Sequence, residues 1–485
     1  MSYTIASIQL YLRETPPGRM AFALGRDGGP GQQMPRLTSP LAHIRIELRG
    51  LDGASTWGCA GDRLSVRWLD KRPGRERGQK LRELVRLIYQ VRDLYLKQPQ
   101  FETPFECWHA RHPQIMQLGK AAGQEDLTSS FASALFERAV IDGFCRLHNK
   151  TFFDMLAAEQ IGIEPAQVHP ELKGLKFRDT LPSAPRSEFF IRHTVGLDDP
   201  LPKTQIPADK RAGDGLPESL AEYLEVDGLR YFKVKVSGNV EFDLERLARI
   251  WDVVAAAEEP VVTLDANEAF DELETFGRFV REFEKRLPGL FDHVPYIEQP
   301  LVWSLSLDPA IAAPLREVAR RKPVIIDEAD AQVDAFRRAH ALGYYGTSHK
   351  NCKGLFKSLL NHALIHAWAS QDIEAVLSAE DLQNLPVVPL QQDFCSLGVL
   401  DLPHCERNGH HYNYGLSFVS AQDKQNATRR HPDLYERRGD EWFLRIVDGR
   451  VRCPSLQVPG LGVHDEPDWS AMEPLDAWVA RRFPA

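Results

Sequence analysis

Hydrophobic and polar residues in the first third of the chain follow patterns that predict strands and then helices. Every second residue from Ala42 to Leu48 is apolar, as expected for a half-buried strand over residues 41–49. Apolar residues at three- and four-residue spacing predict a helix over residues 81–95, and a second helix is predicted from about Ser130. Strands followed by helices indicate an α+β domain, which we expect to cover residues 1–185.

From about Glu188 the pattern changes to short apolar runs, each followed by a helical stretch. Eight such runs occur: 189–195, 231–237, 261–267, 294–300, 323–329, 344–351, 374–381 and 397–403. Repeats of one strand and one crossover helix predict a closed parallel (β/α) TIM-type barrel over residues 186–420. The alternative, an open doubly wound sheet, needs a glycine-rich phosphate turn, and the sequence contains neither GxGxxG nor GxxxxGK[ST].

Two segments do not fit the repeat. Residues 198–216 are rich in Pro, Asp and Lys and are interpreted as an insertion after the first barrel strand. Residues 421–485 are more polar, and we expect them to form an extension that packs on the first domain.

Charged residues stand at the ends of the middle apolar runs. Lys233, Lys235, Asp265, Glu298, Asp327 and Lys350 follow in order, and the last five are separated by 23 to 33 residues. A charge on a buried strand is costly unless it is paired or binds a metal, and strand ends of a barrel converge on the site of chemistry. Three carboxylates offer the hard oxygen ligands that Mg²⁺ prefers. The alternative is that each acid pairs with a lysine or caps a helix.

The motifs around these residues resemble those of the enolase superfamily, on the side of the muconate lactonizing enzymes. They are KVKVSG (233–238), LDANEA (264–269), IEQP (297–300), IDEAD (326–330) and HKNCKG (349–354). The resemblance also covers the first domain, which it implies is a capping domain over the barrel. It implies that Asp265, Glu298 and Asp327 bind Mg²⁺ (or Mn²⁺), and that Lys235 and Lys350 act on opposite faces of a small carboxylate substrate. Lys233 would support Lys235, with Asn267 and Glu328 behind the metal ligands.

The chemistry that follows is removal of a proton next to a carboxylate. Metal coordination stabilises the enediolate, and neighbouring cations are expected to lower the pKa of the lysine base. The outcome is racemisation, epimerisation or dehydration, with cycloisomerisation as an alternative. A Schiff-base aldolase and a ligand-binding protein without turnover are the other hypotheses. Lys353 is the rival of Lys350, which we prefer because it shares a strand face with Ser348.

Substrate contacts are predicted from two segments. Arg13–Arg36 is glycine- and proline-rich and corresponds to the family's capping loop, so Arg19 is a candidate. Residues 401–412 are interpreted as following the eighth strand, and offer His404 and Glu406. The seventh run lacks the histidine of the relatives that resemble mandelate racemase, and the eighth lacks the Asp-x-Asp of dipeptide epimerases.

Composition excludes several classes of protein. The formal net charge is −9 over 485 residues, which argues against nucleic-acid binding. The basic stretch 71–77 is interpreted as a solvated approach to a helix, with a phosphate-binding patch as the alternative. Neither a signal-type start nor a membrane-length apolar run is present. Seven scattered cysteines are typical of a reducing compartment, so we expect a cytoplasmic enzyme. The family resemblance also implies a homo-oligomer.

Overall fold

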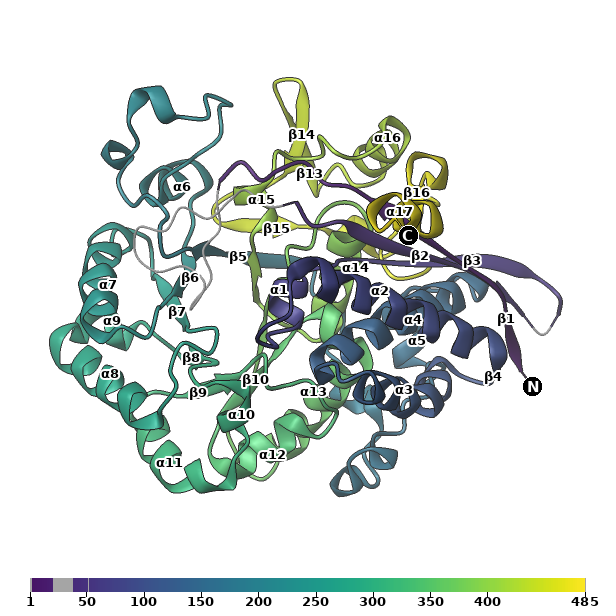
Figure 1. Cartoon of the computed structure of the whole chain (residues 1–485), viewed down its shortest axis with the longest axis horizontal. Coiled ribbons are helices and arrows are strands. Elements are labelled where there is room, and N and C mark those ends of the chain that lie inside the picture. Colours follow the sequence, from purple (N-terminus) through teal and green to yellow (C-terminus); the bar gives the residue numbers. More distant parts are fainter. Residues whose placement is uncertain (1, 21–37, 51, 485) are drawn as a thin grey trace.

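The computed structural model describes residues 2–20, 38–50 and 52–484. Its first part is an antiparallel sheet backed by helices (Figure 1). The sheet has the order β16-β1-β2-β3, with β4 paired to β1. Its strands are β1 (Tyr3–Arg13), β2 (Leu41–Arg49), β3 (Ser55–Arg63), β4 (Gln100–Phe101) and β16 (Glu473–Pro474), and its helices are α1 (Val66–Leu69), α2 (Arg77–Lys97), α3 (Pro104–Ala121), α4 (Asp126–Leu147) and α5 (Phe152–Ala157).

The predicted strand at 41–49 and helix at 81–95 are present as β2 and α2. In α2 the residues that the spacing placed on one face, from Leu81 to Tyr95, are buried. The second predicted helix, α4, differs because it is buried on nearly all sides. It lies between the antiparallel sheet and the second domain, where its polar residues find partners. For example, Arg138 contacts Asp62 at 2.9 Å, with both side chains inaccessible to solvent.

The second part is a parallel sheet of eight strands in the order β11-β10-β9-β8-β7-β6-β5-β12, which forms a nearly closed barrel. The TIM-type fold predicted from the repeats is therefore present. The strands are β5 (Glu188–Val195), β6 (Tyr231–Lys235), β7 (Val261–Asp265), β8 (Ile297–Glu298), β9 (Val324–Ile326), β10 (Gly346–His349), β11 (Val376–Ala379) and β12 (His404–Arg407).

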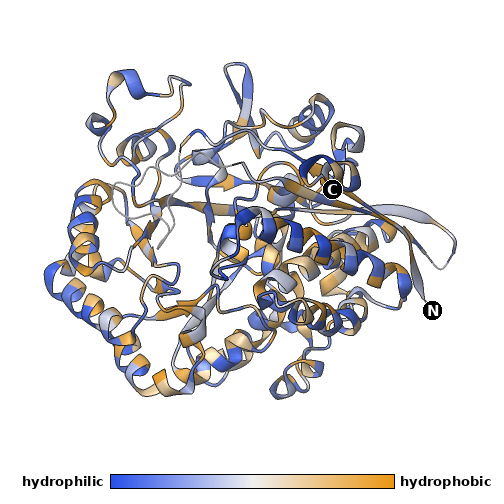
Figure 2. Cartoon of the chain, viewed as in Figure 1, coloured by the Kyte–Doolittle hydropathy of each residue, from blue (hydrophilic) through white to orange (hydrophobic). Residues whose placement is uncertain are grey.

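Amphipathic helices surround the barrel strands, and their colours in Figure 2 alternate between hydrophilic and hydrophobic. In α8, for example, Phe276, Phe279, Val280 and Phe283 are buried. The helices are α6 (Leu220–Asp227), α7 (Val240–Val254), α8 (Leu273–Arg286), α9 (Pro288–Asp292), α10 (Trp303–Ser306), α11 (Ala312–Arg321), α12 (Ala335–Leu342), α13 (Leu355–Ala369), α14 (Val388–Val399) and α15 (Gly409–Tyr412).

The eighth strand is not where the sequence placed it. Residues 397–399 of the predicted run end helix α14, and the strand is β12, at His404–Arg407. All twelve residues of α14 are buried. A helix without a polar face has the same hydrophobic pattern as a buried strand, so periodicity alone could not separate them.

Residues 421–485 contact both domains. They contain α16 (Ala421–Arg430), β13 (Tyr435–Arg438), β14 (Glu441–Leu444), β15 (Arg450–Arg452) and α17 (Leu475–Arg482). Strand β15 pairs with β5 of the barrel, and β16 pairs with β1 of the first sheet. The extension thus joins the two domains instead of packing on the first alone.

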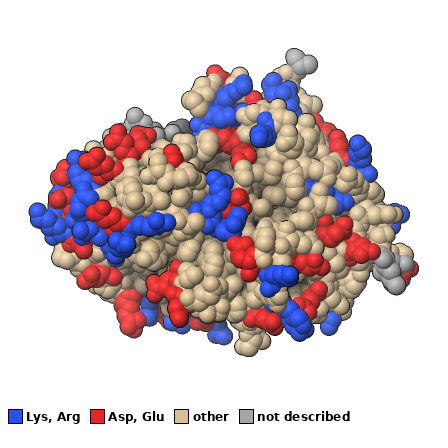
Figure 3. All heavy atoms as spheres, turned by 90° about the horizontal axis from the view of Figure 1, so that it is seen from below, with Lys and Arg blue, Asp and Glu red and all other residues tan. Residues whose placement is uncertain are grey.

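The surface carries mixed charge. On the face in Figure 3, acidic and basic side chains are interspersed. None of the described helices has the length and apolarity needed to cross a membrane.

Candidate active site

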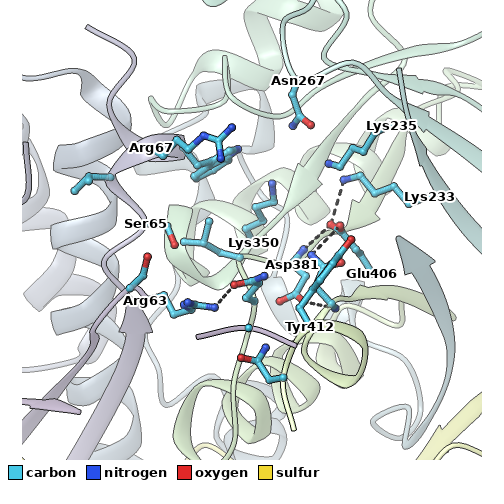
Figure 4. A pocket seen from close by; sticks show the side chains of 18 of the residues that line it. Arg63, Ser65, Arg67, Lys233, Lys235, Asn267, Lys350, Asp381, Glu406 and Tyr412 are labelled. Carbon is cyan, nitrogen blue, oxygen red and sulfur yellow. Dashed lines mark hydrogen bonds and ion pairs between the residues drawn. The ribbon is translucent and has the colours of Figure 1, made fainter. Parts of the chain in front are cut away.

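The carboxyl ends of the barrel strands open into a pocket that the first domain covers. It encloses about 1070 Å³, including its opening to solvent. Barrel residues Lys233, Lys235, Asn267, Lys350, Asp381 and Glu406 line it together with Arg63, Ser65, Arg67, Trp68 and Arg77 of the first domain (Figure 4). The first domain therefore contributes side chains directly to the site.

Two lysines enter this pocket from strands that are far apart in the barrel. Lys235 ends β6, and Lys350 follows β10 directly. In the barrel order these are the second and sixth of eight strands, so they stand on opposite sides of the barrel. Each side chain is 4% exposed. Their ammonium groups approach a bound molecule from different directions.

Three acids lie on the strands between the two lysines. Asp265 ends β7, Glu298 ends β8, and Asp327 directly follows β9. Asp265 is the register partner of both Lys235 and Glu298, so these residues form one row across the sheet. All three carboxylates are inaccessible to solvent.

Lys233 is the central cation of the site. Its Nζ lies 2.9 Å from Asp265 Oδ2 and 2.8 Å from Glu298 Oε2. The same ammonium lies 3.1 Å from Glu406 Oε2 and also pairs with Glu380. One lysine thus forms ion pairs with carboxylates from four different strands.

The two pocket lysines have their own carboxylate partners. Lys235 Nζ lies 2.5 Å from Asp265 Oδ2, and Lys350 pairs with Asp327. The ring of Trp68 covers Lys350, with 4.2 Å between Nζ and the ring centroid. Such a contact favours the charged form of the lysine.

The pKa values follow from these contacts. Burial alone would lower the pKa of Lys350, but the Asp327 carboxylate raises it well above the usual range of a lysine. The pKa of Lys233 is raised in the same way by Asp265 and Glu298. For Lys350 the carboxylate outweighs the neighbouring Lys233 ammonium, which acts to lower its pKa. The expected lowering of the pKa of the lysine base stays a prediction. For Glu298, burial and the negative charge of Asp265 raise the carboxyl pKa well above normal.

The donor chemistry of the three acids fits a hard divalent cation. All six donors are carboxylate oxygens, and all three carboxylates are buried. The spacing of the three carboxylates differs from that of a metal site, because the Lys233 ammonium lies between Asp265 and Glu298. Within the described ranges, no three His, Cys, Asp or Glu side chains are spaced to share one metal ion.

Comparison with solved structures identifies the fold. An enolase from Streptomyces coelicolor has a TM-score of 0.60 and 14% identity, over 99% of both chains. A mandelate racemase/muconate lactonizing enzyme from Bordetella bronchiseptica RB50 has a TM-score of 0.59 and 17% identity, over 97% of this chain and 99% of that one. The fold is that of the enolase superfamily. An enolase from alpha proteobacterium BAL199, solved with bound Mg, covers 97% of this chain and 98% of its own at a TM-score of 0.58 and 14% identity. No family model and no curated protein matches the sequence.

Asn267 and Glu328 lie beside the three acids in this enolase-superfamily fold. The Asn267 amide donates to Glu328 Oε1 at 3.1 Å, and its backbone N–H donates to Asp265 Oδ1 at 2.9 Å. Glu328 also accepts from Trp68 Nε1 at 3.2 Å and pairs with Lys71 at 3.1 Å. Lys71 belongs to the basic stretch interpreted as solvated; that interpretation is wrong for Lys71, which bridges the two domains.

The residues predicted to contact substrate do not lie together in the structure. Glu406 lines the pocket, but from within β12 and not from a loop after it, and it pairs with Lys233. His404 begins β12 and stacks on Tyr231, with 4.8 Å between ring centroids, and is not among the lining residues. Arg19 is held by Asp214 of the 198–216 insertion at 2.5 Å. Residues 21–36 of the predicted capping loop lie outside the described residues.

Lys353 also contacts Asp327, one of the three acids, together with Asp330. Its Nζ lies 3.1 Å from Asp327 Oδ1 and 3.2 Å from Asp330 Oδ2, and it does not line the pocket. The alternation argument fails here because β10 ends at His349 and residues Asn351–Lys353 form a 3₁₀ turn. Lys350 is nevertheless the residue that faces the cavity.

Sequence reasoning missed several residues of the site. Glu380 follows β11, as the other acids follow their strands, and pairs with Lys233 and Arg192. The rule that located the other strand-end charges would have found it. Arg63, Trp68 and Arg77 carry no such signal, because their approach depends on how the two domains dock.

Proposed function

We propose that this protein is an enzyme of the enolase superfamily that removes the proton α to the carboxylate of a small acid. Racemisation, epimerisation or dehydration would follow, with cycloisomerisation as the alternative outcome. The observation that carries the proposal is that Lys235 and Lys350 line one pocket from opposite strands of the barrel, with three buried acids on the strands between them. This arrangement suits proton removal on one face and proton return on the other.

The two lysines take different roles in this proposal. Lys350, whose pKa is raised by Asp327, enters the reaction as an ammonium and donates a proton. Lys235 accepts the α proton from the opposite side. Lys233 stays charged because four carboxylates surround it, and it holds the acidic side chains together while the proton moves.

A divalent cation, Mg²⁺ or Mn²⁺, would be held by Asp265, Glu298 and Asp327, and when bound supplies electrostatic stabilisation of the charge that develops on the substrate carboxylate. The ion pairs of the barrel mouth join six basic residues (Arg192, Lys233, Lys235, Lys350, Lys353, Lys357) and six acidic ones (Asp265, Glu298, Asp327, Asp330, Glu380, Glu406). These charges balance, so a bound divalent cation would add net positive charge close to the substrate carboxylate.

Solvent-deuterium exchange at the α carbon tests the proposal across a library of small carboxylic acids. We expect exchange to require Lys235, so that Lys235→Ala reduces it by at least about 100-fold, and we expect product formation to require Lys350, so that Lys350→Ala reduces turnover by a similar factor, within the range expected for general acid–base catalysis. EDTA should also abolish exchange, and Mg²⁺ should restore it. Exchange that persists in both variants would exclude the mechanism.

The Schiff-base aldolase hypothesis is less well supported. A lysine that forms a Schiff base must be uncharged, whereas carboxylates hold Lys233 and Lys350 in the charged form. Borohydride trapping of a covalent adduct with a carbonyl substrate would nevertheless favour the aldolase.

A further inference from the structure

The wall of the pocket that faces away from Lys235 is built from arginines of the first domain. Arg63 ends β3, Arg67 lies in α1, and Arg77 begins α2. All three line the pocket. In Figure 4, Arg63 and Arg67 lie on one side, and Lys233 and Lys235 lie on the other. The pocket therefore has two cationic ends.

Arg63 is the most unusual member of this group because it is buried. The residue is 6% exposed, and its Nε has no hydrogen-bond partner among the described residues. Its Nη1 donates to Gln383 Oε1, which belongs to a neutral amide. A buried guanidinium ordinarily pairs with a carboxylate, yet no carboxylate within the described ranges lies within 4.0 Å of Arg63.

Arg77 is exposed, unlike Arg63, but it also faces neutral partners. It donates to the backbone oxygen of Thr38 and to Ser39 Oγ, the latter at 3.2 Å. It too lacks a carboxylate within 4.0 Å in the described part of the chain. Burial and the charge of Arg77 lower the pKa of Arg63 to about 10, against the opposing effect of Asp381.

Asp381 is the acid nearest to this wall, and its oxygens are already engaged. One accepts the backbone N–H of Asn384 at 2.6 Å, and the other accepts the backbone N–H of Asn408 at 2.8 Å. It therefore orders the two loops that carry these amides instead of pairing with Arg63. Arg63 and Arg77 therefore keep positive charge that no carboxylate of the described residues pairs with, and a ligand can balance it.

We propose that Arg63 and Arg77 form a second anion site, so that the substrate is an acid with an additional carboxylate or phosphate at its far end. The proposal rests on the proposed function, since the first carboxylate is the one placed between Lys235 and Lys350. A planar guanidinium with a free Nε–H suits two-point binding of either anion. Arg63, which is buried, carries most of the recognition, and the more exposed Arg77 adds to it.

Matched acids test this substrate class. Six-carbon aldonates, the aldarates of the same stereochemistry and the corresponding 6-phosphates differ only in the far-end group. For wild type we expect kcat/KM or deuterium exchange to be at least tenfold higher with the aldarate or the 6-phosphate than with the aldonate. Whichever of the two doubly charged acids is preferred, the aldarate or the 6-phosphate, identifies the second anion as carboxylate or phosphate.

Substitution separates recognition from catalysis. Arg63→Gln should remove the preference: kcat/KM for the doubly charged acid should fall at least tenfold more than kcat/KM for the aldonate, mainly through a higher KM. Arg77→Gln should do the same to a smaller degree. Arg75→Gln is the matched control, because Arg75 is close in sequence but does not line the pocket. Equal rates for aldonate and aldarate in wild type, or an equal loss for both in Arg63→Gln, would overturn the proposal.

Calorimetry with glutarate and inorganic phosphate keeps this test independent of turnover. If no acid exchanges its α proton, the proposed function fails, but weaker binding of either probe to Arg63→Gln than to wild type and Arg75→Gln still supports the anion site. Equal binding to all three proteins refutes it.

Discussion

Lys233 is the residue around which the acidic side chains of the barrel mouth are arranged. Its ammonium contacts Asp265, Glu298, Glu380 and Glu406, and the side chain is 1% exposed. Carboxylates buried at this distance repel one another strongly unless a cation lies between them. The position therefore has a structural role in addition to any catalytic one.

Lys233→Met should consequently destabilise the protein by about 3–5 kcal/mol, the range for removing one partner from a buried ion pair. Urea denaturation measures this loss. Arg321→Met is the control, because Arg321 pairs with Glu284 at the surface, where the two side chains are 45% and 42% exposed, and such a pair contributes about 0–1 kcal/mol. Mg²⁺ should restore more stability to Lys233→Met than it adds to wild type, since the variant leaves Glu298 without its ammonium and Asp265 with that of Lys235 alone. A variant as stable as wild type, with no response to Mg²⁺, would show that Lys233 does not hold the acids together.

At the scale of elements, each short barrel strand delivers a charged side chain from its last residue or the one after it. This is why Asp265, Glu298, Asp327 and Lys350 could be located from sequence, even though β8 has only two residues. Local patterns failed where burial was complete, as at residues 397–399, which end α14 but were interpreted as part of a strand. They also failed for Arg63 and Trp68, whose place in the pocket depends on long-range docking of the first domain.

Helix α4 connects the first domain to the barrel through Glu137. The Glu137 carboxylate accepts the backbone N–H groups of Leu355 and Phe356 at the start of α13, which follows the Lys350 turn. The side chain is buried, and burial raises its pKa from 4.5 to about 7. The folded protein therefore binds this proton more tightly than the unfolded chain does.

This shift predicts a pH dependence of stability. Between pH 4.5 and 7 the folded state binds more protons at Glu137, so the free energy of unfolding should fall as pH rises through this window. The contribution is about 3 kcal/mol in total, since one pKa unit corresponds to about 1.4 kcal/mol. Denaturation of wild type and Glu137→Gln across this range checks it: the variant should show a shallower slope. Parallel curves for the two proteins would contradict the assignment.

At the scale of the whole molecule, the end of the chain returns to the sheet in which it began. Strand β16 pairs with β1 through Tyr11 and Leu12, and α17 follows directly. The indole of Trp478 is 1% exposed, and its Nε1 donates to Glu14 Oε1 at 2.6 Å. Since β15 of the same extension pairs with β5, the C-terminal residues connect the first sheet with the barrel.

If this connection sets how the first domain sits over the pocket, loosening it should affect both stability and substrate binding. Trp478→Ala removes a large buried side chain, so we expect a loss of about 3–5 kcal/mol in unfolding free energy. Trp303→Ala is the control, because its side chain is 54% exposed and a surface substitution changes stability by less than about 0.5 kcal/mol. Because Arg63, Trp68 and Arg77 reach the pocket from the first domain, Trp478→Ala should also raise KM more than it lowers kcat, the lysines being anchored in the barrel. A variant that loses stability but keeps the wild-type KM would show that the C-terminal extension stabilises the first domain without positioning it.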